Sequence, residues 1–276
     1  MNAPIGEASR EAASPARRDK LTVVVLLAAV SALAWAYTVH QASMMDAMEA
    51  AMWRDMNMSM NGMVSSWAPL DIALLLAMWT AMMAAMMLPG SAPMIAAFAT
   101  INSRRRARGA LAVPTLVFLA GYLAVWALFS VAATALQWAL QISGLLTTMM
   151  QSASHYFSAV LFLAAGLYQF SPLKERCLAL CRSTDGFILS EWRDGAAGAF
   201  IMGWRHGLFC AGCCGGLMLL LFAVAVMDLR WVAALAVLVT AEKLLPWPQF
   251  WRVGIGVALI AVSLAFAIFG WRGVAA

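Results

Sequence analysis

Charged residues are scarce in this chain of 276 residues. Lysine and arginine occupy 18 positions and aspartate and glutamate 13, so 11% of the sequence is charged while 64% is hydrophobic. Soluble domains usually carry about 25% charged and about 45–50% apolar residues. The deficit excludes an ordinary water-soluble fold, because a single core cannot hide so much apolar surface. The formal net charge of +5 is then a marker of membrane topology rather than a sign of nucleic-acid binding.

The sequence also lacks the motifs of common enzyme classes. It contains no phosphate-binding glycine-rich loop with lysine, no nucleophile elbow and no zinc-protease helix motif. Its three histidines, His40, His155 and His206, give poor support to a membrane cytochrome with two haems. An ATP-driven pump is not supported, and an enzyme is less favoured than a protein that binds or moves a ligand.

Long hydrophobic runs take the place of charge. The candidate spans are Leu21–Val39, Trp67–Leu88, Leu111–Leu136, Leu145–Phe170, Leu208–Met227, Trp231–Leu245 and Val253–Trp271. Most approach the ~20 residues that cross a bilayer, and the sixth is short. Backbone polar groups cannot stay unpaired in lipid, so these runs must be helices. We predict an all-α, polytopic transmembrane helix bundle of about seven spans, with the first run retained rather than cleaved as a signal peptide.

The distribution of lysine and arginine predicts the orientation of this bundle. The first 20 residues contain four of them, the segment 100–110 another four and the segment 171–207 five, whereas 40–66 contains only Arg54. The positive-inside rule therefore places the N-terminus and the basic loops in the cytoplasm and the C-terminus outside. We expect a basic cytoplasmic tail at 1–20 and a single transmembrane domain at 21–276. In that domain, 40–66 forms an outer loop and 171–207 a cytoplasmic loop.

The five cysteines fall into two groups on the predicted cytoplasmic side. Cys177 and Cys181 are four residues apart on a short helix that Ser171-Pro172 should begin, so they share one helix face. Cys210, Cys213 and Cys214 lie in the first two turns of the fifth predicted span. Thiols stay reduced in the cytosol, where grouped cysteines more often bind metal or do redox chemistry than form structural disulfides. We expect the two groups to approach each other.

Histidine, methionine and glutamate side chains add further candidate metal ligands to the five cysteines. His206 and Met218 continue the four-residue stripe of Cys210 and Cys214, and Glu242 should lie beside the thiols because the connection near Asp228 is short. On the second span, Met82 and Met86 share a face, with Met83 and Met87 beside them. The candidate metal ligands are Cys177, Cys181, His206, Cys210, Cys213, Cys214, Met218, Met82, Met86 and Glu242. Thiolate and thioether ligands select copper(I) over hard cations, and zinc is the alternative.

Each of these features also has a simpler explanation. Methionine often fills gaps between helices, and Glu242 with Lys243 is consistent with a helix end whose charges reach toward water. If the site is empty, we expect Glu242 to be protonated or paired with His206 or Arg205. The outer segment Met44–Met63 holds eight methionines, a pattern that suits copper(I) in an oxidising compartment but also an amphipathic interfacial helix.

Four ordered motifs carry a resemblance to a known family. They are Met82-Met-Ala-Ala-Met-Met-Leu-Pro89, Tyr168-Gln-Phe-Ser-Pro-Leu-Lys174 with Cys177 and Cys181-Arg182, Gly212-Cys-Cys214 with Leu217-Met218, and Glu242-Lys243. Over roughly Trp67 to Val257 the chain resembles a bacterial family described as predicted metal-binding integral membrane proteins. The resemblance implies that the five cysteines and Glu242 are signature positions of the cytoplasmic (inner) membrane protein. Gly215 departs from the pattern, where an aromatic residue is expected.

Three hypotheses follow from these observations. The first is a membrane protein that handles copper(I) for transport, for delivery to a partner or for metalloenzyme assembly, through the candidate ligands above. The second is a thiol–disulfide redox protein that uses Cys210-Ala-Gly-Cys213. The third is a structural or assembly subunit in which the cysteines only pack. The expected partners are the lipid bilayer and a metal-donor or metal-acceptor protein, with no nucleic acid, and the sequence does not indicate an oligomeric state.

Overall fold

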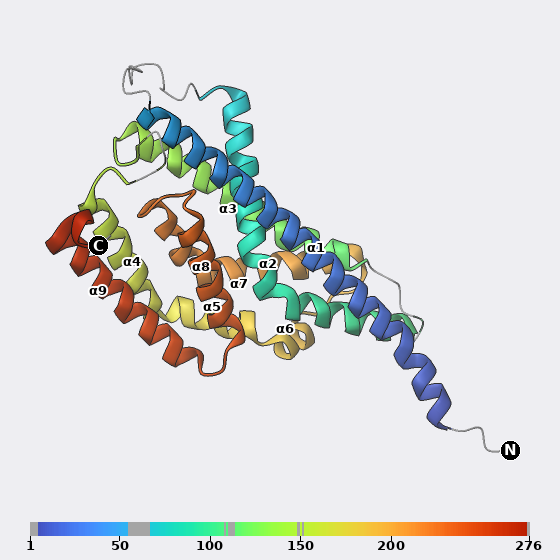
Figure 1. The fold of residues 1–276 in the computed structure, drawn as a ribbon. Coiled ribbons are helices and arrows are strands. Elements are labelled where there is room, and N and C mark those ends of the chain that lie inside the picture. Colours follow the sequence, from blue (N-terminus) through green and yellow to red (C-terminus); the bar gives the residue numbers. More distant parts are fainter. Residues whose placement is uncertain are drawn as a thin grey trace.

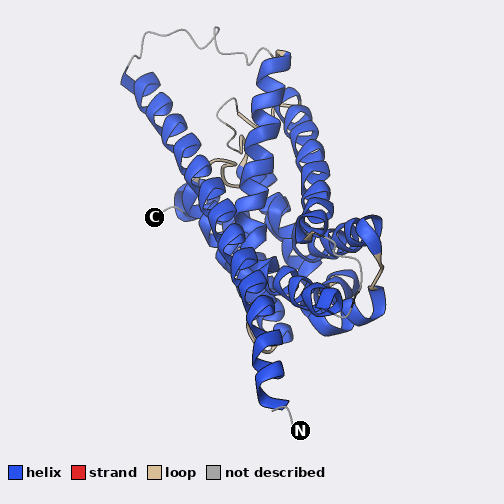
Figure 2. Ribbon diagram, turned by 90° about the vertical axis from the view of Figure 1, so that its right-hand side faces the viewer, coloured by secondary structure: helices blue, strands red, loops and turns tan. Residues whose placement is uncertain are grey.

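The computed structural model describes residues 5–54, 67–107, 109, 114–147, 150 and 152–274. The helices are α1 (Ile5–Arg54), α2 (Pro69–Ala107), α3 (Thr115–Ile142), α4 (His155–Gln169), α5 (Pro172–Arg182), α6 (Thr184–Glu191), α7 (Gly195–Met218), the 3-10 turn η2 (Leu219–Phe222), α8 (Leu229–Leu244) and α9 (Pro248–Val274) (Figure 1). No β-strand occurs among the described residues, as Figure 2 shows. The all-α prediction is confirmed.

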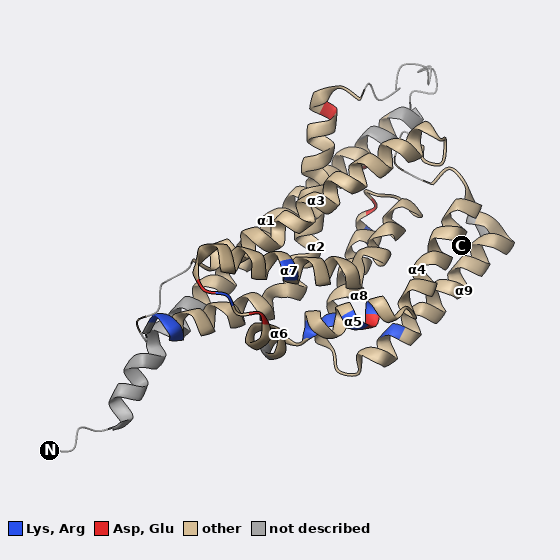
Figure 3. Cartoon of the chain, turned by 180° about the vertical axis from the view of Figure 1, so that it is seen from behind, with Lys and Arg blue, Asp and Glu red and all other residues tan. Residues whose placement is uncertain are grey.

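Five of the described helices are long and apolar enough to cross a membrane, and a sixth span results if α4 and α5 count as one. These two helices are bent by 64° at the break between them. The remaining predicted span, the sixth along the chain, corresponds to α8, which has only 16 residues. Figure 3 shows how little charge the bundle carries, and α3 and α4 contain none. The described helices thus give five or six candidate spans, against about seven predicted.

Several helices are longer than their hydrophobic runs predicted, whereas the fourth run, Leu145–Phe170, was predicted too long, because α4 begins only at His155. The second run was predicted to end at Leu88, but α2 continues through Pro89 and Pro93 to Ala107 and bends on the way (Figure 1). Similarly, α1 continues to Arg54, into the predicted outer loop. Residues 55–66 of that loop lie outside the described part of the chain. Helical hydrogen bonding thus continues where the sequence turns polar.

The start of α7 changes the depth at which the thiols lie. This helix begins at Gly195 rather than at Leu208, because Arg205 and His206 interrupt the hydrophobic pattern but not the helix. Arg205 forms an ion pair with Glu191, and His206 is buried. Cys210 lies 15 residues after Gly195, which is about 22 Å along the helix axis. The cysteines are therefore well inside α7 and not in its first two turns as predicted.

Helix α7 runs parallel to α3 at very short range. A methyl group on Gly121 would collide with the main-chain oxygen of Phe200, and one on Gly207 would lie 2.9 Å from Val125. Residue numbers rise together along both helices, so the two run in the same direction. Small residues permit such backbone contact inside a membrane. By the same reasoning α4 and α9 are antiparallel, since Phe162 stacks on Phe266 and Gln169 lies by Gly256, and they lie side by side in Figure 1.

Candidate functional site

The two groups of cysteines meet where α5 crosses α7. The Cys177 sulfur lies 2.7 Å from the position that a Cβ atom on Gly212 would occupy. The Cys181 thiol interacts with Cys210 and Cys213. All five cysteines are free thiols, and Cys177 alone is half-buried whereas the others are buried. The expected approach of the two groups is confirmed, and we call Cys181, Cys210, Cys213 and Cys214 the thiol cluster.

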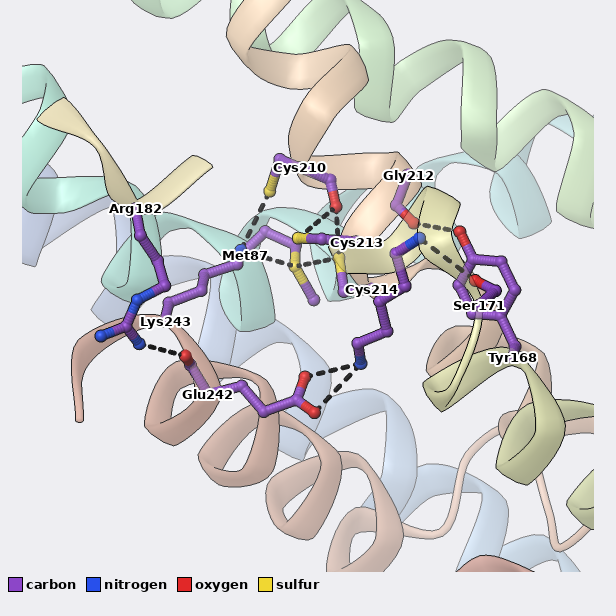
Figure 4. A network of polar contacts seen from close by, with 11 residues as sticks. Met87, Tyr168, Ser171, Arg182, Cys210, Gly212, Cys213, Cys214, Glu242 and Lys243 are labelled. Atoms are coloured by element: carbon purple, nitrogen blue, oxygen red, sulfur yellow. Dashed lines mark hydrogen bonds and ion pairs between the residues drawn. The ribbon is translucent and has the colours of Figure 1, made fainter. Parts of the chain in front are cut away.

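Two thiols of this cluster are engaged with the backbone of α7 (Figure 4). Cys213 and Cys214 donate hydrogen bonds to the carbonyl of Cys210, at 3.2 and 2.8 Å. In this arrangement, no three His, Cys, Asp or Glu side chains of the described residues form a group that could hold a metal ion. Binding an ion at the cluster requires these thiols to rotate away from the carbonyl, exchanging a weak sulfur hydrogen bond for a metal–sulfur bond.

The methionine that reaches the cluster is Met87. Its sulfur lies 3.6 Å from the Cys214 sulfur, in the polar network of Figure 4. Three methionines that the sequence analysis named as candidate ligands are buried in the same hydrophobic core as the thiols: Met82, Met86 and Met218. The sequence analysis placed Met87 beside the helix face of Met82 and Met86, but the sequence does not show which face of α2 packs against α7. A thioether next to thiols adds a soft, uncharged ligand to the cluster.

Lys243, which the sequence analysis did not count among the candidate ligands, lies among the sulfur atoms. Its ammonium nitrogen lies 2.9 Å from the Cys210 sulfur and 3.9 Å from the Met87 sulfur. Gly90 makes room for it, because a Cβ there would lie 3.0 Å from the Lys243 side chain. The Tyr122 hydroxyl is hydrogen-bonded to the same Cys210 sulfur at 3.2 Å. A cation and a hydroxyl therefore face one thiol inside the bundle.

Glu242 faces the opposite way, toward α5. Both of its carboxylate oxygens accept hydrogen bonds from the Lys174 ammonium, at 3.0 and 2.8 Å, and the side chains are 2% and 0% exposed. The expected pairing with His206 or Arg205 is wrong. Successive residues of a helix point about 100° apart, so Glu242 and Lys243 serve different neighbours. Arg182 donates to the carbonyl of Glu242 and fixes the end of α8 (Figure 4).

His206 is buried among aromatic rings beside the cluster. Its ring stacks on Tyr122 at 5.6 Å between centroids and meets the edge of Phe187 at the same distance. Neither ring nitrogen has a hydrogen-bond partner in the described structure. Buried polar groups are usually paired, so these two nitrogens require an explanation, such as a ligand that binds there. The sequence analysis placed His206 on the same helix face as Cys210, and in the structure His206 lies beside the thiol cluster.

The chain matches a known protein family. A family model described as PpoB2, copper chaperone, matches residues 76–266, a range that contains every cysteine, Met87 and Lys243. The chain belongs to the PpoB2 copper chaperone family. Membership in PpoB2 supports copper handling and confirms the metal-related part of the resemblance, whereas the membrane character rests on the apolar helices. Comparison with curated proteins gave no match, and neither did comparison with solved structures.

Proposed function

We propose that this PpoB2-family chain binds copper(I) inside a membrane-spanning helix bundle and delivers it to a partner protein. The ligands are the thiols of Cys210 and Cys214 with the thioether of Met87, and Cys181 and Cys213 lie within reach as exchange ligands. The observation that carries the proposal is the packing of buried thiols against a methionine sulfur within the residues that match a copper chaperone family. Thiolate and thioether together favour copper(I) over zinc or hard cations.

The charge of the site also favours a monovalent ion. Two thiolates and one copper(I) ion carry a net charge of about −1, which the Lys243 ammonium balances. A zinc ion on the same two thiolates would leave the ammonium without a counter-charge, and uncompensated charge in a low-dielectric interior is costly. Lys174 and Glu242 already neutralise each other and leave Lys243 available for this task.

Other predicted ligands take supporting positions in this proposal. Cys177 is the most exposed thiol and is the point at which an acceptor protein would receive the ion from the cluster. His206, with its unpartnered nitrogens, is a further ligand when the thiols rotate. Met82, Met86 and Met218 surround the site, and Glu242 anchors α5 to α8 through Lys174. The protein would lie in a bacterial cytoplasmic membrane, with its N-terminus and basic loops in the cytoplasm.

Elemental analysis of detergent-purified protein, loaded with copper(I) under reducing conditions, tests the proposal. The wild type should retain about one or two equivalents of copper, as a small sulfur site allows. A variant with Cys210, Cys213 and Cys214 replaced by serine should retain none, and Met87→Leu should bind more weakly. As a control, the double variant Lys174→Met, Glu242→Leu removes a buried ion pair without touching sulfur and should keep its copper.

Two results would contradict the proposal. Wild-type protein without copper above background would exclude the thiol cluster as a copper site. Loss of copper from the folded control variant would make Glu242 a ligand and the sulfur-only coordination wrong.

A further inference from the structure

A stripe of α2 faces α3 above the thiol cluster. Trp79, Met83, Met87 and Ser91 are each four residues apart and therefore lie on one side of the helix. Both ends of the stripe are bonded to α3. The Trp79 indole donates to Gln137 at 2.8 Å, and the Ser91 hydroxyl donates to Tyr122 at 2.5 Å. Met83 and Met87 lie between these bonds, so they face α3 as well.

The facing side of α3 carries polar groups that have no partner. In the described structure, the indole nitrogen of Trp126, the hydroxyl of Thr134 and the amide nitrogen of Gln137 are buried without a hydrogen bond. The two helices are antiparallel, and the bonded pairs 79–137 and 91–122 place Met83 level with residues 130–133. Three unpaired polar groups in one stripe cost free energy, which water or an ion between the helices would recover.

By their spacing along α2 and α3, these groups follow one another from the thiol cluster toward the predicted outer side. Met87 is one end, since its sulfur contacts Cys214, and the hydrogen bond between Trp79 and Gln137 is the other. Eight residues separate Met87 from Trp79, or about 12 Å along α2. Beyond Trp79, residues 69–77 of α2 are exposed or half-buried, and Gln137 is the last buried residue of α3. We call Trp79, Met83, Met87, Trp126, Thr134 and Gln137 the outer row.

We infer that the outer row is a passage for copper(I) between the thiol cluster and the outer face of the bundle. This inference rests on the proposed function. The ion passes from the Met87 thioether to Met83, while the hydroxyl of Thr134 and the amide of Gln137 solvate it or the water that accompanies it. Thioethers suit this task because they bind copper(I) without adding charge and hold it less tightly than thiolates. The bond between Trp79 and Gln137 closes the passage when no ion crosses.

Neutral ligands in series are what an ion path requires. Binding must be favourable enough for entry and weak enough for release, as in selectivity filters with adjacent sites. The end of the row at Trp79 also has a source of ions within the predicted topology, since the methionine-rich segment Met44–Met63 is expected on that side. The thiol cluster then receives copper from outside and passes it to the cytoplasmic side.

The test compares two leucine variants of the same helix. Met83→Leu removes the thioether of the outer row with little change in volume. Met78→Leu makes the same change at a buried methionine of α2 outside the stripe. Wild type and both variants are loaded with copper(I) in right-side-out membrane vesicles, and a membrane-impermeant copper(I) chelator is added outside. Thiol-bound copper of the purified proteins is measured separately in detergent.

We expect all three proteins to bind equal amounts of copper in detergent. In vesicles, the external chelator should remove copper from wild type and from Met78→Leu at the same rate. It should remove copper from Met83→Leu about tenfold more slowly, because one binding step is lost. Equal rates for Met83→Leu and wild type would overturn the passage. If the external chelator removed no copper from the wild type, the passage would also be overturned, but the proposed function would stand. Absence of thiol-dependent copper in detergent would instead refute the proposed function.

Discussion

Two neighbouring charges in α8 show how single residues shape the site. Glu242 reaches Lys174 on α5, whereas Lys243 reaches Cys210 on α7. The three buried charges sum to one positive charge in excess, and the nearest atom able to balance it is the Cys210 sulfur. A thiolate is also the form of cysteine that binds metal. Lys243 thus couples the charge of the bundle interior to the state of the thiol cluster.

Replacing Lys243 should therefore change both affinity and metal preference. Without its ammonium, copper(I) on two thiolates leaves an uncompensated negative charge, so Lys243→Met should weaken copper(I) binding about tenfold or more, or about 1.4 kcal/mol. Zinc, which neutralises two thiolates by itself, should gain relative to copper(I). Lys243→Arg keeps the charge and should restore the preference for copper(I). Competition with chelators of known affinity measures both metals. Unchanged affinities in Lys243→Met would show that the lysine only packs beside the sulfur.

The sequence predicted the residues of the site better than their contacts. The thiols, their helical spacing and the stripe through His206 could be predicted because they follow from local periodicity and from the chemistry of each residue type. The contacts of Met87, Lys243 and Lys174 depend on how α2, α5, α7 and α8 pack, and these helices are far apart in the sequence. Ser171-Pro172 predicts that a new helix begins there, but no local pattern predicts the 64° bend or the contact of Lys174 with Glu242.

At the scale of the helices, the main differences lie at the helix ends. The predicted runs stop at proline or at charged residues, as at Pro89 and Arg205, but helices stop where backbone hydrogen bonding stops. The prediction therefore shortened α2 and α7, and it placed the cysteines too near a boundary. The break between α4 and α5 could be predicted from Ser171-Pro172, because serine caps helices and proline favours their first turn. In the structure, Ser171 accepts a hydrogen bond from the Lys174 amide, and Pro172 lies in the first turn of α5.

The contact between α3 and α7 positions Tyr122 against Cys210, so it should control the site. Gly203→Ala would place a methyl group against the carbonyl of Phe118, and the helices must separate to admit it. We expect a loss of stability of about 1–3 kcal/mol and weaker copper binding. Gly254→Ala on α9 meets open space and should keep the melting temperature or raise it slightly. Thermal unfolding and copper titration in detergent measure both effects. Equal behaviour of the two variants would mean that the helix contact tolerates expansion.

Taken as a whole molecule, the bundle has one consistent set of helix directions. Bonded pairs make α2 antiparallel to α3, and α3 is parallel to α7. The antiparallel pair of α4 and α9 ends with Gly270 beside His155, at the start of α4. These directions are those of a chain that alternates across a membrane, provided that the short helix α8 counts as a crossing. Its 16 residues reach about 24 Å, somewhat less than the ~30 Å of a hydrocarbon core.

The two ends of this chain should consequently lie on opposite sides of the membrane. A fluorescent protein that folds only in the cytoplasm should be bright when fused before Met1, and alkaline phosphatase, which is active only outside, should be active when fused after Ala276. As controls, alkaline phosphatase fused before Met1 should be inactive, and the fluorescent protein fused after Ala276 should not fluoresce. A cytoplasmic C-terminus would mean that α9 runs in the opposite sense relative to the membrane, against its antiparallel packing on α4. The C-terminal phosphatase would then be inactive and the C-terminal fluorescent protein bright. That result would overturn the alternation of α7, α8 and α9, while the outer row between α2 and α3 and the thiol cluster with its copper would be unaffected.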